Sequence, residues 1–185
     1  MNNTAVITND GVCVYFNSKV KIRKLTKVML VLLNIMALMF YIFILWSVMD
    51  DSPLTKGTII SCFLILPCVY IFSIGLITLW NLFGEENIII NPKSISHRKH
   101  FGFFTTQWAV KQFRNLYYEI EIKKEELKLG TITFIDHNQL DLPVPIFSSS
   151  VYVPEADLKE LVSQLEVVFS IEHLTKDGNN YIHLN

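Results

Sequence analysis

The chain has 185 residues, of which 51% are apolar and 18% charged, and its formal net charge is −1. A soluble domain usually carries about 25% charged residues, so this composition excludes a disordered chain and a basic nucleic-acid-binding tail. Three cysteines are too few to stabilise a small secreted scaffold through disulfides.

The N-terminal segment, residues 1–27, combines a predicted β-hairpin with a basic cluster. Residues 5–8 and 12–16 have strand character, and Asp10-Gly11 between them suits a tight turn. If this segment is cytoplasmic, the hairpin could pair with an edge of the sheet predicted below. Five basic residues are expected either to contact anionic lipid head groups or only to orient the chain: Lys19, Lys21, Arg23, Lys24 and Lys27.

Two stretches without charge follow, over residues 28–49 and 57–84. The first has 22 residues, which at about 1.5 Å per residue can cross a hydrocarbon core of roughly 30 Å, and the second has 28. The first stretch is too long for the core of a signal peptide, and no small-residue cleavage site follows it. We therefore predict a transmembrane hairpin over residues 28–84, with its turn at Ser52-Pro53.

The orientation of this hairpin follows from the basic residues at its ends. Basic residues precede the first stretch and follow the second, whereas the loop between them carries only Lys56. The positive-inside rule then places both termini in the cytoplasm. Trp46 and Trp80 are expected at membrane interfaces, where tryptophan is enriched.

Small and polar residues inside the predicted hairpin should mediate contact between its two helices. Asn34 lies near the middle of the first helix and can form a hydrogen bond across to the second. Gly57, Ser61 and Gly75 allow the helices to approach closely. A substrate contact in a pore is the alternative role for Asn34, but neither stretch contains a charged residue to support an ion pathway.

From Glu85 onward the pattern changes to short strands separated by turn residues. A Pro/Ser-rich loop is predicted over residues 143–154 and an amphipathic helix over residues 155–170. Together they predict an antiparallel sheet or barrel capped by one C-terminal helix, an α+β, pleckstrin-homology-like (PH-like) domain over residues 85–171 with a tail over residues 172–185. Another α+β sandwich is the alternative. The predicted strands cover residues 86–91, 94–99, 105–110, 116–122, 130–135 and 139–144.

Several residues near the second apolar stretch carry a resemblance to a known group of proteins. Trp80, Gly84 and Glu86 stand at the membrane exit, the strand Ile88-Ile89-Ile90 follows, and Gly102 lies in the next hairpin. With these features, residues 28–170 resemble bacterial inner-membrane proteins with two transmembrane helices and a cytoplasmic PH-like domain. The resemblance implies that fold and location, and little about activity, because most such proteins have no assigned activity.

No motif in the sequence carries catalytic or metal chemistry. Glycine-rich phosphate loops, the hydrolase nucleophile elbow and the zinc-protease motif do not occur in it. His97 and His100 have no further ligands at a spacing that suits a metal ion. We therefore expect no enzyme, no metal and no cofactor.

Arg98 and Lys99 are expected either in a basic patch that contacts lipid head groups or in an ordinary solvated hairpin. An aromatic cluster follows them within eight residues, and it can belong to the sheet core or form an interfacial or partner-binding face. Its members are Phe101, Phe103, Phe104 and Trp108.

Three functions remain open on this sequence. The first is a non-enzymatic membrane protein whose PH-like domain binds a protein partner, in assembly, scaffolding or immunity, through the sheet edges and the helix over residues 155–170. The second is a module that binds anionic lipids, and the third is a subunit of an oligomeric channel or transporter. Expected partners are the bilayer and another protein or a second copy, and no nucleic acid.

Overall fold

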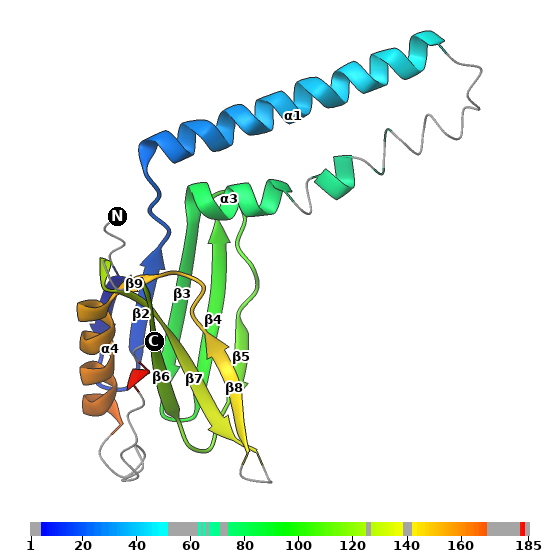
Figure 1. Cartoon of the computed structure of the whole chain (residues 1–185). Coiled ribbons are helices and arrows are strands. Elements are labelled where there is room, and N and C mark those ends of the chain that lie inside the picture. The colour runs from blue at the N-terminus through cyan, green and yellow to red at the C-terminus, as the bar shows by residue number, and fades with distance from the viewer. Residues whose placement is uncertain are drawn as a thin grey trace. The chain divides into compact units, whose positions relative to one another are not determined.

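The computed structural model describes residues 5–51, 63, 65, 67–70, 74–124, 127–138, 142–169 and 182–183. The chain forms two structural units, one from residues 1–21 and 83–185 and the other from residues 22–82. We refer to them as the β-domain and the apolar unit. The apolar unit is inserted into the sequence of the β-domain, between two strands that are neighbours in one sheet (Figure 1).

The first sheet of the β-domain is antiparallel and contains the N-terminal hairpin. Its strands, in spatial order, are β1 (Ala5–Asn9), β2 (Val14–Lys19), β3 (Gly84–Asn91), β4 (Ser94–Phe101) and β5 (Ala109–Gln112). The predicted hairpin is confirmed, since β1 pairs with β2, and β2 in turn pairs with β3. Its turn requires a glycine, because Gly11 has a φ of +88°.

The second sheet is built from the C-terminal half of the chain. Its order is β10 (Ile182–His183), β6 (Tyr117–Lys124), β7 (Leu129–His137) and β8 (Pro143–Ser148), and β9 (Val153–Pro154) also pairs with β7. All pairs are antiparallel except β10 with β6.

Two local predictions for these strands were wrong. Residues 143–148 form β8 instead of a loop, and their prolines are tolerated because β8 is at the edge of the described part of its sheet. Residues 105–108 precede β5, which starts at Ala109, since the chain first makes a tight turn that bridges Thr105 to His100. Residues 139–141 lie outside the described residues.

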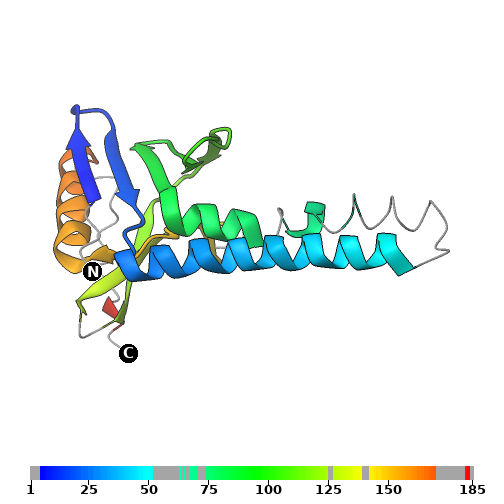
Figure 2. The same ribbon diagram turned by 90° about the horizontal axis from the view of Figure 1, so that it is seen from above.

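The predicted C-terminal helix is confirmed as α4 (Glu155–Val168). Its apolar stripe of Leu158, Leu161 and Leu165 is buried against β1 and β2 of one sheet and β7 and β9 of the other. Figure 2 shows α4 beside β1, to which it is tied by a hydrogen bond of 2.9 Å from the Ala5 amide to Asp157 Oδ2. The helix therefore connects the two sheets along one side of the β-domain.

The core of the β-domain lies between the two sheets and α4. Strand alternation points Phe16, Ile88 and Ile95 inward from the first sheet, and Ile132 and Phe134 inward from the second. These side chains are fully buried. Alternate residues of a strand face opposite sides of its sheet, and only one side of each sheet packs on the core. The described fold of the β-domain is thus an α+β arrangement of two antiparallel sheets and a C-terminal helix.

The apolar unit contains α1 (Lys24–Asp51) and α3 (Leu76–Phe83). The first predicted membrane helix is confirmed as a helix, and it begins four residues earlier than the apolar stretch. Of the second predicted helix, residues 67–70 and 76–83 are helical, while most of residues 57–73 lie outside the described residues. Strand β3 begins directly after α3, so helix and sheet meet without a linker.

Candidate functional site

Helix α1 presents apolar side chains to all sides. The most apolar window within Lys24–Ser47 has a mean hydropathy of 2.7, and none of that window is buried within the protein. Among the described residues it is the one helix long and apolar enough to cross a membrane. Trp46, expected as an interfacial anchor, is 70% exposed near the end of this stretch. An exposed apolar surface of this size is typical of a helix that contacts lipid or another protein.

Asn34 connects the two parts of the apolar unit. Its Nδ2 donates hydrogen bonds to Thr78 Oγ1 at 3.1 Å and, within α1, to the Leu30 carbonyl at 2.7 Å. Its Oδ1 accepts a hydrogen bond from the Tyr70 hydroxyl. Both hydrogen-bonding ends of the side chain are thus used inside the protein, which is the behaviour of a structural contact.

The other expected packing residues are only partly covered by the described residues. Gly75 lies before α3, where an added Cβ would be 3.7 Å from the Tyr70 carbonyl oxygen, an ordinary contact distance. Trp80 is half-buried in α3. Gly57 and Ser61 lie outside the described residues.

The basic residues of the N-terminal segment differ in their surroundings. Lys19, at the end of β2, forms an ion pair of 2.9 Å with Glu85 of the adjacent strand. Lys21 is exposed two residues beyond β2, Arg23 and Lys24 are exposed where α1 begins, and Lys27 is half-buried in its first turn. Exposed ion pairs such as Lys19–Glu85 contribute only about 0–1 kcal/mol to stability.

Arg98 and Lys99, which were expected either in a basic patch that contacts lipid or in an ordinary solvated hairpin, differ in their surroundings. They lie on opposite faces of β4, as neighbours in a strand must. The Arg98 guanidinium stacks on Trp108, with 4.5 Å from Cζ to the ring centroid. Lys99 turns inward and donates a hydrogen bond of 2.6 Å to Ser150 Oγ.

Lys99 belongs to a polar layer formed by Ser18, Glu86, Lys99 and Ser150, of which Ser18 and Glu86 are buried. Ser18, Glu86 and Lys99 lie opposite one another on β2, β3 and β4, and the Ser150 amide donates a hydrogen bond of 3.0 Å to Glu86 Oε2. Glu86 is fully buried, with Lys99 Nζ 3.9 Å from its Oε1. Burial raises the pKa of the Glu86 carboxyl, against the opposing influence of Ser150 and Lys99.

This polar layer contains two unusual atoms. Within the described residues, the buried Oγ of Ser18 and Oε1 of Glu86 have no hydrogen-bond partner. A buried unpaired polar atom costs about 1–3 kcal/mol, so the layer lowers the stability of the β-domain. The sequence contains a signal for this layer: Glu86 shares the alternation of Ile88 and Ile90, and therefore their inward face.

An aromatic loop, residues 101–104, connects β4 to the residues that lead into β5. Phe101 and Phe104 are half-buried and stack with ring centroids 4.6 Å apart, whereas Phe103 is 78% exposed. Trp108 is also exposed, on the outer face of the sheet. The interpretation of this cluster as sheet core is wrong for Phe103 and Trp108, because the turn at Gly102, with a φ of +92°, directs the chain away from the sheet interior.

A groove of about 260 Å³ lies between β6 and α4. Tyr118, Ile120 and Ile122 line it from one face of β6, and Val162 lines it from the helix. Charged side chains surround this apolar lining, and Glu155 and Lys159 pair at 2.6 Å. Burial, followed by the charge of Glu166, raises the pKa of the Tyr118 hydroxyl, so it stays protonated as a hydrogen-bond donor.

The edge of β6 beside this groove accepts an additional strand. Ile182 and His183 pair in parallel with Ile120 and Glu121, so a segment from the far end of the chain adds to this edge. The sequence predicted that sheet edges and the helix surface would form contacts, but it could not predict which edge lies next to the helix. That neighbourhood depends on the pairing of β6 with β7, which is set by the whole sheet.

Within the described residues, no group of three or more His, Cys, Asp and Glu side chains is placed to hold a metal ion. No family model matches the sequence, and no curated protein shows significant similarity to it. Inference about function therefore rests on the surfaces described above: the uncovered apolar helix, the aromatic loop and the groove beside β6.

Proposed function

We propose that this chain is an integral membrane protein, anchored by a transmembrane hairpin, whose β-domain binds a segment of a protein partner. The hairpin is supported by where the apolar unit joins the β-domain. The Val20 amide donates a hydrogen bond of 2.8 Å to the Gly84 carbonyl, so the chain leaves the sheet and returns to it at the same place. If α1 crosses the bilayer, the residues between α1 and β3 must cross back, since β2 and β3 are paired neighbours.

The charge distribution supports a cytoplasmic location for the β-domain. Basic residues flank the entrance to α1 and follow the return to β3, and positive residues are retained on the cytoplasmic side. The two antiparallel sheets with a C-terminal helix are compatible with a PH-like domain of the kind found in bacterial inner-membrane proteins with two transmembrane helices. We propose that fold and that location for this chain.

The added strand on β6 is the observation that carries the binding function. We propose that an extended segment of a partner protein adds to this edge, in parallel as residues 182–183 do. Main-chain hydrogen bonds would then hold the segment, while alternate side chains enter the groove beside α4. The groove is smaller than the roughly 300–1,000 Å³ of small-molecule sites, which favours a few apolar side chains over a cofactor-sized ligand.

Accessibility labelling tests the membrane part of this proposal. Single cysteines would replace exposed residues of the β-domain, Val12 and Val144, and Thr55 in the predicted external loop, in a chain without its native cysteines. In sealed right-side-out vesicles, a membrane-impermeant maleimide should label position 55 alone and reach all three positions after permeabilisation. Labelling of positions 12 and 144 from outside would contradict a cytoplasmic β-domain.

Photo-crosslinking in native membranes tests the partner. A photoreactive residue at Val162, in the groove, should yield an adduct, whereas the same residue at Val167, exposed on α4 outside the groove, should not. Mass spectrometry of the adduct should identify a contiguous extended segment. Deletion of residues 181–185 should increase adduct formation, because Ile182 and His183 pair with the edge of β6. Equal crosslinking from both positions would contradict binding in the groove.

A further inference from the structure

We propose that the aromatic loop inserts into the interfacial layer of the leaflet that α1 enters, with Phe103 as its tip. The loop would be a second membrane anchor, which fixes the orientation of the β-domain on the bilayer. This inference rests on the proposed membrane hairpin, and the experiment below distinguishes failure of the loop from failure of the hairpin.

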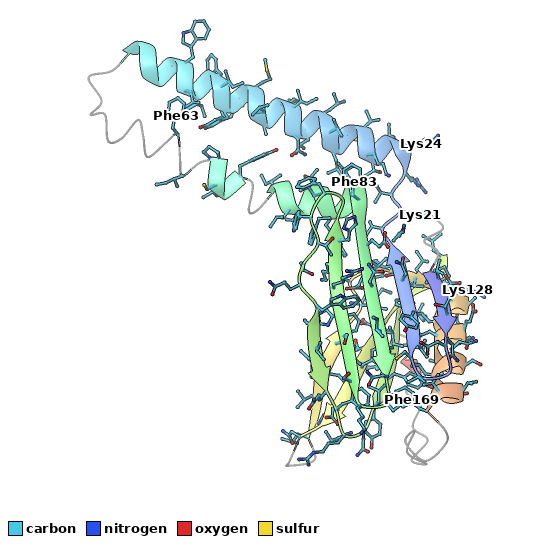
Figure 3. The ribbon with its side chains drawn as sticks, turned by 180° about the vertical axis from the view of Figure 1, so that it is seen from behind. Lys21, Lys24, Phe63, Phe83, Lys128 and Phe169 are labelled. Atoms are coloured by element: carbon cyan, nitrogen blue, oxygen red, sulfur yellow. The ribbon has the colours of Figure 1, made fainter. Side chains whose placement is uncertain are left out.

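The loop lies at the end of the β-domain where the chain connects to the apolar unit. Phe101 pairs directly with Gly84, the first residue after α3, and a Cβ on Gly102 would be 3.0 Å from Phe83 Cβ. Figure 3 shows Lys21 and Phe83 at this same end of the sheet. Only residues 22 and 23 separate Lys21 from α1, and three peptide steps span at most roughly 11 Å, so this end must stay close to the membrane.

The conformation of the loop is fixed by its own hydrogen bonds. The Phe101 amide donates to the Phe104 carbonyl at 2.9 Å, and the Thr106 amide donates to the Lys99 carbonyl at 2.8 Å. Between them, Gly102 adopts its positive φ, and Phe101 stacks on Phe104. These hydrogen bonds close the turn while Phe103 stays 78% exposed at its tip.

The chemistry of this surface favours lipid over water. A phenylalanine side chain exposed at a loop tip is unfavourable in water, but it is stable at the boundary of head groups and acyl chains. Basic side chains lie at the same end of the sheet, where Lys19 ends β2 and Lys21 lies two residues beyond it, and they suit the anionic head groups of that layer. The short tether to α1 keeps the loop at this boundary.

Spin labelling of the full chain in vesicles of phosphatidylethanolamine and phosphatidylglycerol tests the proposal. After replacement of Cys13, Cys62 and Cys68 by serine, a nitroxide would be attached at Phe103→Cys or at the control Val12→Cys. Val12 is exposed in the β1–β2 turn, at the opposite end of the sheet. Collision rates with oxygen, which concentrates in lipid, and with a water-soluble nickel chelate would be compared.

We expect the ratio of oxygen to nickel collisions to be severalfold higher at position 103 than at position 12. Equal ratios in a chain that resists alkaline extraction would overturn the loop anchor and leave the hairpin intact. Protection of position 103 from both reagents would also overturn it, since a protein would then cover the loop. A chain that alkaline buffer extracts from the vesicles would contradict the hairpin itself.

Discussion

The β-domain and the apolar unit cover their apolar side chains in opposite ways. In the β-domain, the leucines of α4 and the isoleucines of the strands are enclosed by two sheets and a helix. In the apolar unit, none of the side chains in the most apolar stretch of α1 is buried. A helix with one polar and one apolar face is typical of the boundary between a protein core and water. A long helix that is apolar on all sides is typical of a lipid bilayer.

The polar residues of the two units repeat this contrast. In the β-domain the exceptional side chain is Glu86, a carboxylate inside an apolar core. In the apolar unit it is Asn34, an amide in the middle of the charge-free stretch of α1. Each is held by hydrogen bonds from its own unit, but only Asn34 has both of its polar atoms paired. The four predictions below test this contrast, from the largest expected effect to the smallest.

The substitution Leu161→Ala tests whether protein covers α4. Leu161 is fully buried, so its truncation should reduce the free energy of unfolding by about 2–5 kcal/mol. Amide hydrogen exchange of the full chain in detergent, read in β1 and β7, measures the loss. Val167→Ala on the exposed side of the same helix should cost under about 0.5 kcal/mol. Equal losses would mean that another molecule covers the outer side of α4.

The substitution Leu38→Arg tests whether lipid covers α1. An arginine at the centre of a membrane helix costs about 2.5–3.5 kcal/mol of insertion free energy. We expect the fraction of chains that resist alkaline extraction to fall sharply. Val167→Arg, at an exposed position on α4, is the control and should leave this fraction unchanged. Full retention of the Leu38→Arg chain in membranes would show that protein, and not lipid, surrounds this part of α1.

The substitution Glu86→Gln tests the buried carboxylate. Because burial raises its pKa in the folded state, wild type is most stable below the ordinary carboxyl pKa and loses stability as the pH rises through the folded pKa. Glutamine keeps an oxygen for the Ser150 amide and adds a donor for the unpaired Ser18 Oγ. We expect a gain of about 1–2 kcal/mol at pH 8 and none at pH 4, measured by chemical unfolding in detergent.

Glu85→Gln is the control, since its side chain points to the other face of β3. Burial opposes ionisation there too, but hydrogen bonds from Asn17 and Lys19 prevail, and the pKa of Glu85 is lowered. Its stabilisation is therefore present above the ordinary carboxyl pKa and lost as the pH falls through the folded pKa. The control should lose stability at pH 8. A loss for Glu86→Gln as well would mean that the contact with Lys99 outweighs burial.

Much of this arrangement was accessible from the sequence because it depends on local periodicity. The charge-free stretch predicted α1, the Asp10-Gly11 turn predicted the first hairpin, and the spacing of leucines predicted α4. In each case the pattern spans one element and its immediate neighbour. The error at β8 has the same origin, because Pro143 and Pro145 indicate a loop locally and are tolerated only at the edge of a sheet.

The candidate site was less predictable because it depends on contacts between distant segments. The polar layer joins Ser18, Glu86 and Ser150, which are brought together by pairing across the inserted apolar unit and by facing sheets. The groove needs β6 and α4, and its added strand comes from residues 182–183. The exposure of Phe103 likewise depends on one glycine turn. These contacts join residues that are far apart in the sequence, so no local pattern predicts them.

The smallest effect concerns Asn34, where a double-mutant cycle with Thr78 separates a structural contact from a pore residue. Asn34→Leu removes a hydrogen bond that joins the two parts of the apolar unit, and such bonds contribute about 0.6 kcal/mol each. Unfolding in mixed detergent micelles should therefore give a coupling energy of that size between Asn34→Leu and Thr78→Val. Additive effects, together with altered ion flux in vesicles, would indicate a pore instead. A structural contact predicts coupling without flux, because the amide's hydrogen bonds are already made within the protein.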